Sequence, residues 1–457
     1  MTRWLCLNAK MGHATKTVIL MMLLPGLRLE AQVAGAFGSP STDGGPAATG
    51  QQTANALVVG TSTGVVYDSN ALSSRPPISD FQYTLYPLVG LRLDRPRWDA
   101  RMYFAPGLSY SSANLPEYQA LSLKSDVRLQ YRPTERLSVE FNNYLVSSSN
   151  PFDSFSSGAS TVSAGNGTGS AGNGAGSVAN LNYLPKTNEL VTTDVAYSLT
   201  PRTSLKMLAS YNYLDYAKNP GVSPAMQPFQ QSNTTQVSMG ISHDLSPRYS
   251  ETFHYVGQLF DSGQGRVKTV GQSFQYEFLW APTPTLRLSV TAGPEHLQTE
   301  YSAAGRLSGI ANLATQRASE WTLAARFSIS EIFGKNSISA TVSQQPSIGN
   351  QYQGVVQQTV VEGNLTRQLV GKAALVLFGS YSLSTPVSIG QNILRLSNNY
   401  SSSGATISKT LADHWVVACS YWYLFQNQPP NAEEIYSGNH NRVAFSLSYT
   451  LTRPLKQ

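Results

Sequence analysis

The feature that most constrains the fold of this chain is a two-residue alternation of apolar and polar side chains, repeated from about Leu57 to Leu451. In the clearest stretch, Ala120–Arg132, the apolar residues point one way while Lys124 and Asp126 point the other. The last stretch, before Leu451, alternates in the same way. A period of two with one polar face is typical of a half-buried antiparallel strand.

The connections between these stretches alternate in length. Eight are short, near 94–97, 133–135, 201–202, 246–248, 282–284, 333–335, 370–371 and 412–413. Nine longer ones lie near 68–79, 113–117, 150–187, 217–231, 262–266, 300–315, 347–353, 385–396 and 428–439. They join about 18 strands, with short turns on one rim and long loops on the other, which is typical of outer-membrane barrels with short periplasmic turns.

Composition excludes the main alternatives to a barrel. Only 13% of the 457 residues are charged, against roughly 25% in an ordinary soluble domain. The longest apolar run, Thr17–Leu27, is too short for the helices of about 20 residues that a helical membrane protein needs. Lipid offers no hydrogen bonds, so every backbone N–H and C=O inside a membrane must be paired within the protein, and a sheet that spans the membrane must close. We therefore predict an all-β fold: a transmembrane antiparallel up-and-down β-barrel.

The first thirty residues have the pattern of an export signal. Arg3, Lys10 and Lys16 precede the apolar run, and Ala31 followed by Gln32 is an acceptable cleavage site. We predict a signal peptide at 1–31, a flexible periplasmic leader at 32–56 and the barrel at 57–457. Cleavage removes four basic residues and one acidic residue, so the net charge falls from +6 to +3, and a nucleic-acid partner is not expected.

The sequence contains no motif for catalysis or for cofactor binding. A nucleophile elbow, a phosphate-binding glycine loop and a zinc-binding helix motif are all missing, so no enzyme activity, metal or cofactor is expected. After cleavage Cys419 would be the one cysteine left, which excludes a disulfide framework. An envelope hydrolase with a Ser/His pair on the barrel wall stays open as an alternative.

Charged residues on the polar faces of the strands are the first candidates for function. Rings of inward charge set selectivity in pores, although such residues can also simply pair across strands in a wet interior. By alternation, nine charged residues are predicted to face the lumen: Arg101, Lys124, Asp126, Arg128, Glu140, Glu277, Arg287, Arg326 and Arg442.

Aromatic residues near the ends of the stretches predict two interfacial girdles. Indole and phenol rings prefer the headgroup level of a membrane, although they are also good strand formers. Tryptophans fall beside the short turns and tyrosines towards the long loops, and the girdle candidates are Trp98, Trp280, Trp415, Tyr110, Tyr213 and Tyr381.

Two features add detail to this picture. The long loop 150–187 carries no charge between Asp153 and Lys186, so it would form either a neutral constriction for uncharged solutes or a flexible surface loop. Pro87, Pro106 and Pro294 fall inside expected strands, where each removes a ladder hydrogen bond. We expect these prolines at bulges or beyond the bilayer edge, unless the strand boundaries lie elsewhere.

The start of the barrel resembles a known family. Gly64–Asn70, with the sequence Gly-Val-Val-Tyr-Asp-Ser-Asn, is followed by Ser79-Asp80-Phe81 and a long second strand. This opening resembles that of the outer-membrane β-barrels associated with exopolysaccharide systems of Gram-negative bacteria. The resemblance implies a barrel for polymer passage or a related role in the envelope.

The sequence thus predicts an outer-membrane barrel that acts as a passive channel or conduit for exopolysaccharide or small uncharged solutes. Its expected partners are outer-membrane lipid, the barrel assembly machinery and the transported solute. Besides the wall hydrolase, a structural or adhesive surface barrel with an occluded lumen remains an alternative.

Overall fold

The computed structural model describes residues 55–71, 77–112, 121–148, 186–216, 231–262, 267–301, 316–348, 355–386, 398–427 and 438–455. The proposed signal peptide, nearly all of the leader and the loop at 150–185 lie outside the described residues. Among the residues described, no helix is long and apolar enough to cross a membrane.

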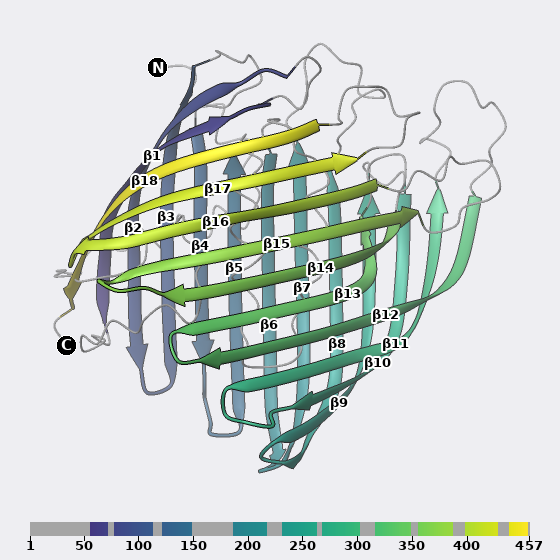
Figure 1. The fold of residues 1–457 in the computed structure, drawn as a ribbon. Coiled ribbons are helices and arrows are strands. Elements are labelled where there is room, and N and C mark those ends of the chain that lie inside the picture. Colours follow the sequence, from purple (N-terminus) through teal and green to yellow (C-terminus); the bar gives the residue numbers. More distant parts are fainter. Residues whose placement is uncertain are drawn as a thin grey trace, which may run out of the picture.

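Eighteen strands make up a single antiparallel sheet that closes on itself (Figure 1). Each strand pairs with its neighbours in the chain, and β1 pairs with both β2 and β18. The prediction of an up-and-down barrel of about 18 strands is therefore confirmed. The strands are β1 Ala56–Asp68, β2 Asp80–Arg95, β3 Trp98–Ser111, β4 Leu121–Tyr131, β5 Leu137–Ser148, β6 Lys186–Thr200, β7 Thr203–Tyr216, β8 Ser232–Ser246, β9 Tyr249–Ser262, β10 Val267–Trp280, β11 Leu286–Tyr301, β12 Gln316–Phe333, β13 Asn336–Ile348, β14 Val355–Gln368, β15 Ala373–Pro386, β16 Asn398–Ala412, β17 Trp415–Asn427 and β18 Gly438–Pro454.

The short turns lie where the sequence predicts them, and local chemistry explains how they form. The hydroxyls of Thr134, Thr200 and Thr283 each accept a hydrogen bond from a backbone N–H of the following strand start. Gly334, between β12 and β13, has a φ of 58°, a left-handed conformation that glycine adopts without the steric cost of a side chain.

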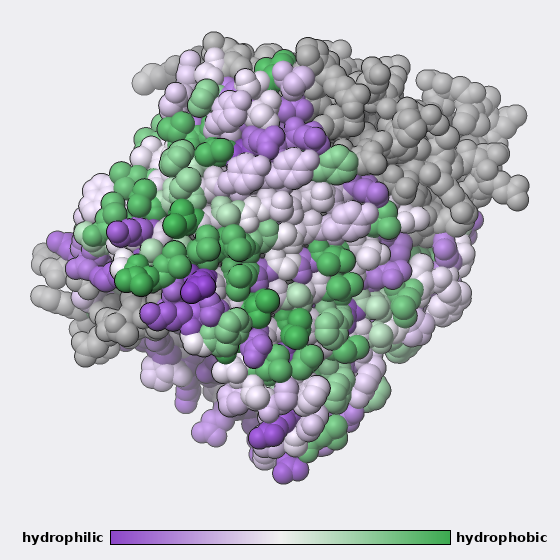
Figure 2. All heavy atoms as spheres, in the orientation of Figure 1, coloured by the Kyte–Doolittle hydropathy of each residue, from purple (hydrophilic) through white to green (hydrophobic). Residues whose placement is uncertain are grey.

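The two faces of the sheet differ in the way the alternation predicts. One face carries the large exposed apolar side chains, among them Trp321 at 70%, Phe274 at 69% and Phe253 at 60% exposure. Figure 2 shows such side chains spread over the outer wall of the barrel. The other face carries serine, threonine and charged side chains, so the outside suits lipid and the inside suits water.

The three prolines that the alternation places inside strands do lie inside strands, and they mark gaps in the ladder. Pro87 and Pro106 would face each other between β2 and β3, where pairing is missing from Tyr86–Leu88 opposite Ala105–Gly107. Pro294 lies where the ladder between β10 and β11 skips two pairs. The register is the same on both sides of each gap, so the strands continue without a bulge.

Candidate functional site

All nine charged residues predicted to face the lumen lie on the same face of the sheet. Residues paired in an antiparallel ladder point to the same side, so facing can be followed from strand to strand around the ring. Arg101 pairs with Arg128 and Glu277 pairs with Thr291, which in turn pairs with Arg326. The same reasoning places Lys124, Asp126, Glu140, Arg287 and Arg442 on this inner face.

Three arginines form a row on the inner wall. Arg92 on β2 pairs with Arg101 on β3, and Arg101 pairs with Arg128 on β4. Sequence reasoning missed Arg92 because it lies close to a short turn, where the alternation fades. Adjacent cations repel each other unless anions lie among them, and the structure supplies such anions.

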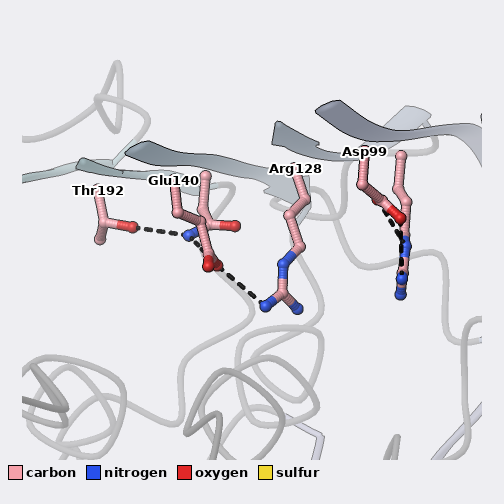
Figure 3. Close-up of polar contacts among 6 residues, drawn as sticks. Asp99, Arg128, Glu140 and Thr192 are labelled. Carbon is pink, nitrogen blue, oxygen red and sulfur yellow. Dashed lines mark hydrogen bonds and ion pairs between the residues drawn. The ribbon is translucent and has the colours of Figure 1, made fainter. Parts of the chain in front are cut away.

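Acidic and amide groups compensate the arginine row. Arg101 Nε lies 3.0 Å from Asp99 Oδ1, and Arg128 Nη2 lies 3.0 Å from Glu140 Oε1. Asn142 donates to Glu140 at 3.1 Å and to Thr192 at 3.3 Å, so the contacts continue across β4, β5 and β6 (Figure 3). The side chains of Arg101 and Arg128 stay 40% and 39% exposed. Such half-exposed pairs contribute little stability but leave charged groups in reach of a passing solute.

Among the other predicted charges, Asp126 adjoins this row, since it lies two residues from Arg128 on β4 and interacts with it electrostatically. By contrast, Lys124, Glu277 and Arg442 have contacts outside the row. Lys124 Nζ lies 4.5 Å from the centroid of the Tyr86 ring. Glu277 interacts electrostatically with Lys206 and Arg326. Arg442 lies over Trp422, 5.6 Å from the ring centroid. The inner wall therefore holds several separate charged groups rather than one ring of charge, and Lys206 is a further member that sequence reasoning missed.

The residues that carry the exopolysaccharide resemblance hold strand ends together. Asp68 Oδ1 accepts a hydrogen bond from the backbone N–H of Asn70 at 2.9 Å and lies 3.3 Å from His440 Nδ1 on β18. Asp80 accepts from the hydroxyls of Ser111 at 2.7 Å and Ser112 at 3.0 Å. In the structure these carboxylates therefore tie together the ends of β1, β2, β3 and β18 by hydrogen bonds.

Small hydroxyl side chains line much of the remaining inner wall and bond across the strands. Each pair fills little volume while it offers both donors and acceptors. The pairs include Ser380–Ser402 at 2.6 Å, Ser289–Ser328 at 2.6 Å, Thr269–Thr299 at 2.8 Å, Thr406–Ser420 at 2.9 Å and Ser62–Ser448 at 3.0 Å.

All six girdle candidates lie on the outer face. Two of the three tryptophans contact a tyrosine ring: Trp280 stacks on Tyr249 at 6.3 Å, and Trp415 lies tilted against Tyr449 at 4.8 Å between ring centroids. The register also places the other four side chains on the outer face: Trp98, Tyr110, Tyr213 and Tyr381. Their placement suits interfacial anchors, which stays a prediction until the membrane position is measured.

One outward histidine has a serine partner. His296 Nε2 lies 2.7 Å from Ser319 Oγ, and its ring packs against Trp321. A nucleophilic pair also needs a group that orients the histidine. The adjacent Glu295 points to the inner face, and the residue that pairs with His296 on β10 is Gln272. Neither the neighbour in the chain nor the partner on β10 therefore supplies a carboxylate that could orient His296 as in a triad.

Comparison with known proteins gives neighbours in fold alone. No family model matches the chain, and no curated protein matches it. Among solved structures, Pseudomonas aeruginosa OpdQ is 9% identical and covers 87% of this chain and 99% of its own, with a TM-score of 0.43. The outer membrane protein OprD from Pseudomonas aeruginosa is 8% identical and covers 93% and 98%, with a TM-score of 0.42.

A third neighbour is Pseudomonas aeruginosa OccK2 (OpdF), whose structure is in complex with glucuronate. It is 8% identical and covers 87% of this chain and 98% of its own, with a TM-score of 0.41. Because none of the three reaches a TM-score of 0.5, the function of this chain has to be argued from its own residues.

Proposed function

We propose that this protein is a passive, non-enzymatic channel for small hydrophilic solutes in the outer membrane. The observation that carries the proposal is a closed ring of 18 strands with an apolar outer face and a charged, hydroxyl-rich inner face. Barrels of 16–18 strands are wide enough to leave an aqueous channel that strand side chains alone do not fill.

The inner wall supports solutes that form hydrogen bonds. Serine and threonine pairs offer neutral donors and acceptors, and the arginine row beside Asp99 and Glu140 offers both signs of charge. Small sugars and similar polar molecules fit this chemistry. Passage of exopolysaccharide would rest on the resemblance of the opening residues alone, and in this barrel those residues hold strand ends together, so the proposal is limited to small solutes.

The proposal includes the route to the membrane. The N-terminal segment would direct export and be cleaved before Gln32. The assembly machinery would then insert the barrel, with the outer face in contact with outer-membrane lipid. Fractionation should therefore recover a mature chain that starts near Gln32 in the outer membrane, with a gel mobility that shifts on boiling.

Liposome swelling tests the transport step. The purified full-length barrel, verified as folded by its heat-modifiable mobility, is reconstituted with neutral sugars of increasing size. The proposal predicts fast swelling with a monosaccharide, slower swelling with a trisaccharide and none with a polysaccharide. Swelling no faster than in liposomes with boiled protein would contradict it and favour a structural barrel with an occluded lumen.

A further inference from the structure

The short turns of the barrel carry mostly positive charge. They join one strand to the next at 96–97, 132–136, 201–202, 247–248, 281–285, 334–335, 369–372 and 413–414, and all eight lie in the described part of the chain. Their acidic residues are Glu135 and Asp413. Their cations number seven, and all are exposed: Arg97, Arg132, Arg136, Arg202, Arg248, Lys335 and Lys372. We call these eight turns together the short-turn rim.

The opposite rim, where the long loops begin, has no such excess of positive charge. The last two residues of each strand at that rim include the cations Lys186, Lys268 and Arg317 and the acids Asp68, Asp80, Asp215, Asp261 and Glu300. Lys268 pairs in register with both Asp261 and Glu300, and Arg317 Nη2 lies 3.5 Å from Glu300 Oε1. Neighbouring acids therefore compensate Lys268 and Arg317.

The cations of the short-turn rim have little compensation of this kind. In the described part of the chain one of the seven, Lys372, forms an ion pair, with Asp413 at 3.5 Å. Both side chains of that pair are highly exposed, at 70% and 86%. The other six cations form no ion pair with a described residue, so their charge acts on whatever surrounds the rim.

Aromatic side chains fix the level of these cations in a membrane. Trp98 follows Arg97 and Tyr249 follows Arg248 in the chain. Both rings lie on the outer face and are 40% and 39% exposed. Such rings prefer the boundary between acyl chains and headgroups. A cation one residue closer to the turn therefore lies at the level of the lipid phosphates.

The distribution of the cations around the barrel indicates what they bind. They occupy six of the eight short turns: those between β2 and β3, β4 and β5, β6 and β7, β8 and β9, β12 and β13, and β14 and β15. A rigid protein partner would contact one side of such a ring, whereas a lipid leaflet surrounds the whole barrel. The distribution therefore favours lipid headgroups, and the sign of the charge favours anionic ones.

We propose that the short-turn rim binds anionic phospholipids, such as phosphatidylglycerol, in the leaflet that surrounds it. The lipid phosphate pairs with a turn arginine or lysine, and the acyl chains lie along the apolar outer face beside the aromatic rings. The interaction depends on the outer surface of the barrel alone, so it stands whether or not the lumen conducts.

Spin-labelled lipids test this preference. The folded full-length barrel is reconstituted in phosphatidylcholine vesicles with a trace of spin-labelled phosphatidylglycerol or phosphatidylcholine, and the immobilised fraction of each label is measured. Wild type should bind the phosphatidylglycerol label at least about twofold more strongly. Salt at about 1 M should abolish the difference, because the Debye length falls to about 3 Å. Equal association of the two labels at low salt would overturn the proposal and favour an acidic protein as the partner.

A graded series of variants locates the preference on the rim. Arg97→Gln with Arg248→Gln removes two of the seven cations and should lower the excess association of phosphatidylglycerol by about a quarter. Adding Arg132→Gln, Arg136→Gln, Arg202→Gln and Lys335→Gln should remove most of the rest.

Lys268→Gln with Arg317→Gln is the matched control, because it removes two exposed cations from the opposite rim, where acids compensate them. Its preference for phosphatidylglycerol should equal that of wild type. An equal fall in the control and in Arg97→Gln with Arg248→Gln, or an unchanged preference in the sixfold variant, would overturn the proposal. The salt series needs wild-type protein only, so the test survives a variant that fails to fold.

Discussion

At the residue scale, strand alternation was enough to place side chains on a face but not to assign their partners. Lys124, Asp126 and Arg128 lie two residues apart, so one assignment of the face settles all three. The contact of Arg128 with Glu140 depends on the register between β4 and β5, which periodicity does not contain. Arg92 and Lys206 were missed because the alternation of apolar and polar residues is weak close to a short turn.

The arginine row should bias the channel towards anions. In the variant Arg101→Gln with Arg128→Gln, two positive charges leave the inner wall, while Asp99 and Glu140 keep theirs. The cation-to-anion permeability ratio should rise by about twofold or more, because wall charge sets the local ion concentration. Reversal potentials in a salt gradient measure the ratio.

The control for this prediction keeps the net charge of the wall. Arg128→Gln with Glu140→Gln removes one cation and one anion that contact each other. Its permeability ratio should stay near that of wild type. An equal shift in the two double variants would show that pore shape, not charge, sets selectivity.

At the element scale, strands and turns were predictable because both signals are local. Alternation marks the strands, and proline, glycine and aspartate mark the short turns, as between β2 and β3 or β12 and β13. The effect of prolines within strands was not predictable in the same way. Whether Pro87, Pro294 or Pro346 interrupts a ladder depends on which neighbour its missing N–H would face, and hence on pairing.

Pro346 on β13 has no N–H to donate to the carbonyl oxygen of Leu323 on β12, and Gln357 Nε2 donates to that oxygen at 3.0 Å instead. A double-mutant cycle tests this substitution of one donor for another. Gln357→Ala should destabilise the wild-type barrel by about 1 kcal/mol, because the Leu323 carbonyl loses its donor. In a Pro346→Ala background the restored N–H can reach Leu323, so the same change should have little effect. Urea unfolding of the reconstituted barrel measures both steps. An equal loss in the two backgrounds would show that Gln357 does not replace the proline's donor.

At the scale of the whole molecule, closure follows from one property of every strand. Each has an apolar face and a polar face, and the ring formed by β1 pairing with β18 leaves no open edge among the described strands. The alternation of the strands and the lengths of the connections predicted this architecture. They could not predict where the ladder between β12 and β13 stops, because that depends on the pairing of three strands.

Insertion into lipid should be sensitive to the face on which a charge is placed. Val237 on β8 is outward and 46% exposed, while its neighbour Gln236 points inward. Val237→Arg should lower the stability of the membrane-inserted barrel by about 2–4 kcal/mol if it lies near the midplane. Gln236→Arg should have much less effect. Folding titrations into lipid vesicles compare them, and equal losses would contradict the assignment of the faces.

The central claim, that this barrel conducts, is tested most directly by single-channel current recording. Full-length protein with a heat-modifiable mobility is added to a planar lipid bilayer in symmetric salt. The account predicts stepwise, long-lived current increments that are absent when boiled protein is added. A correctly folded barrel that inserts into the bilayer and gives no current would contradict the account.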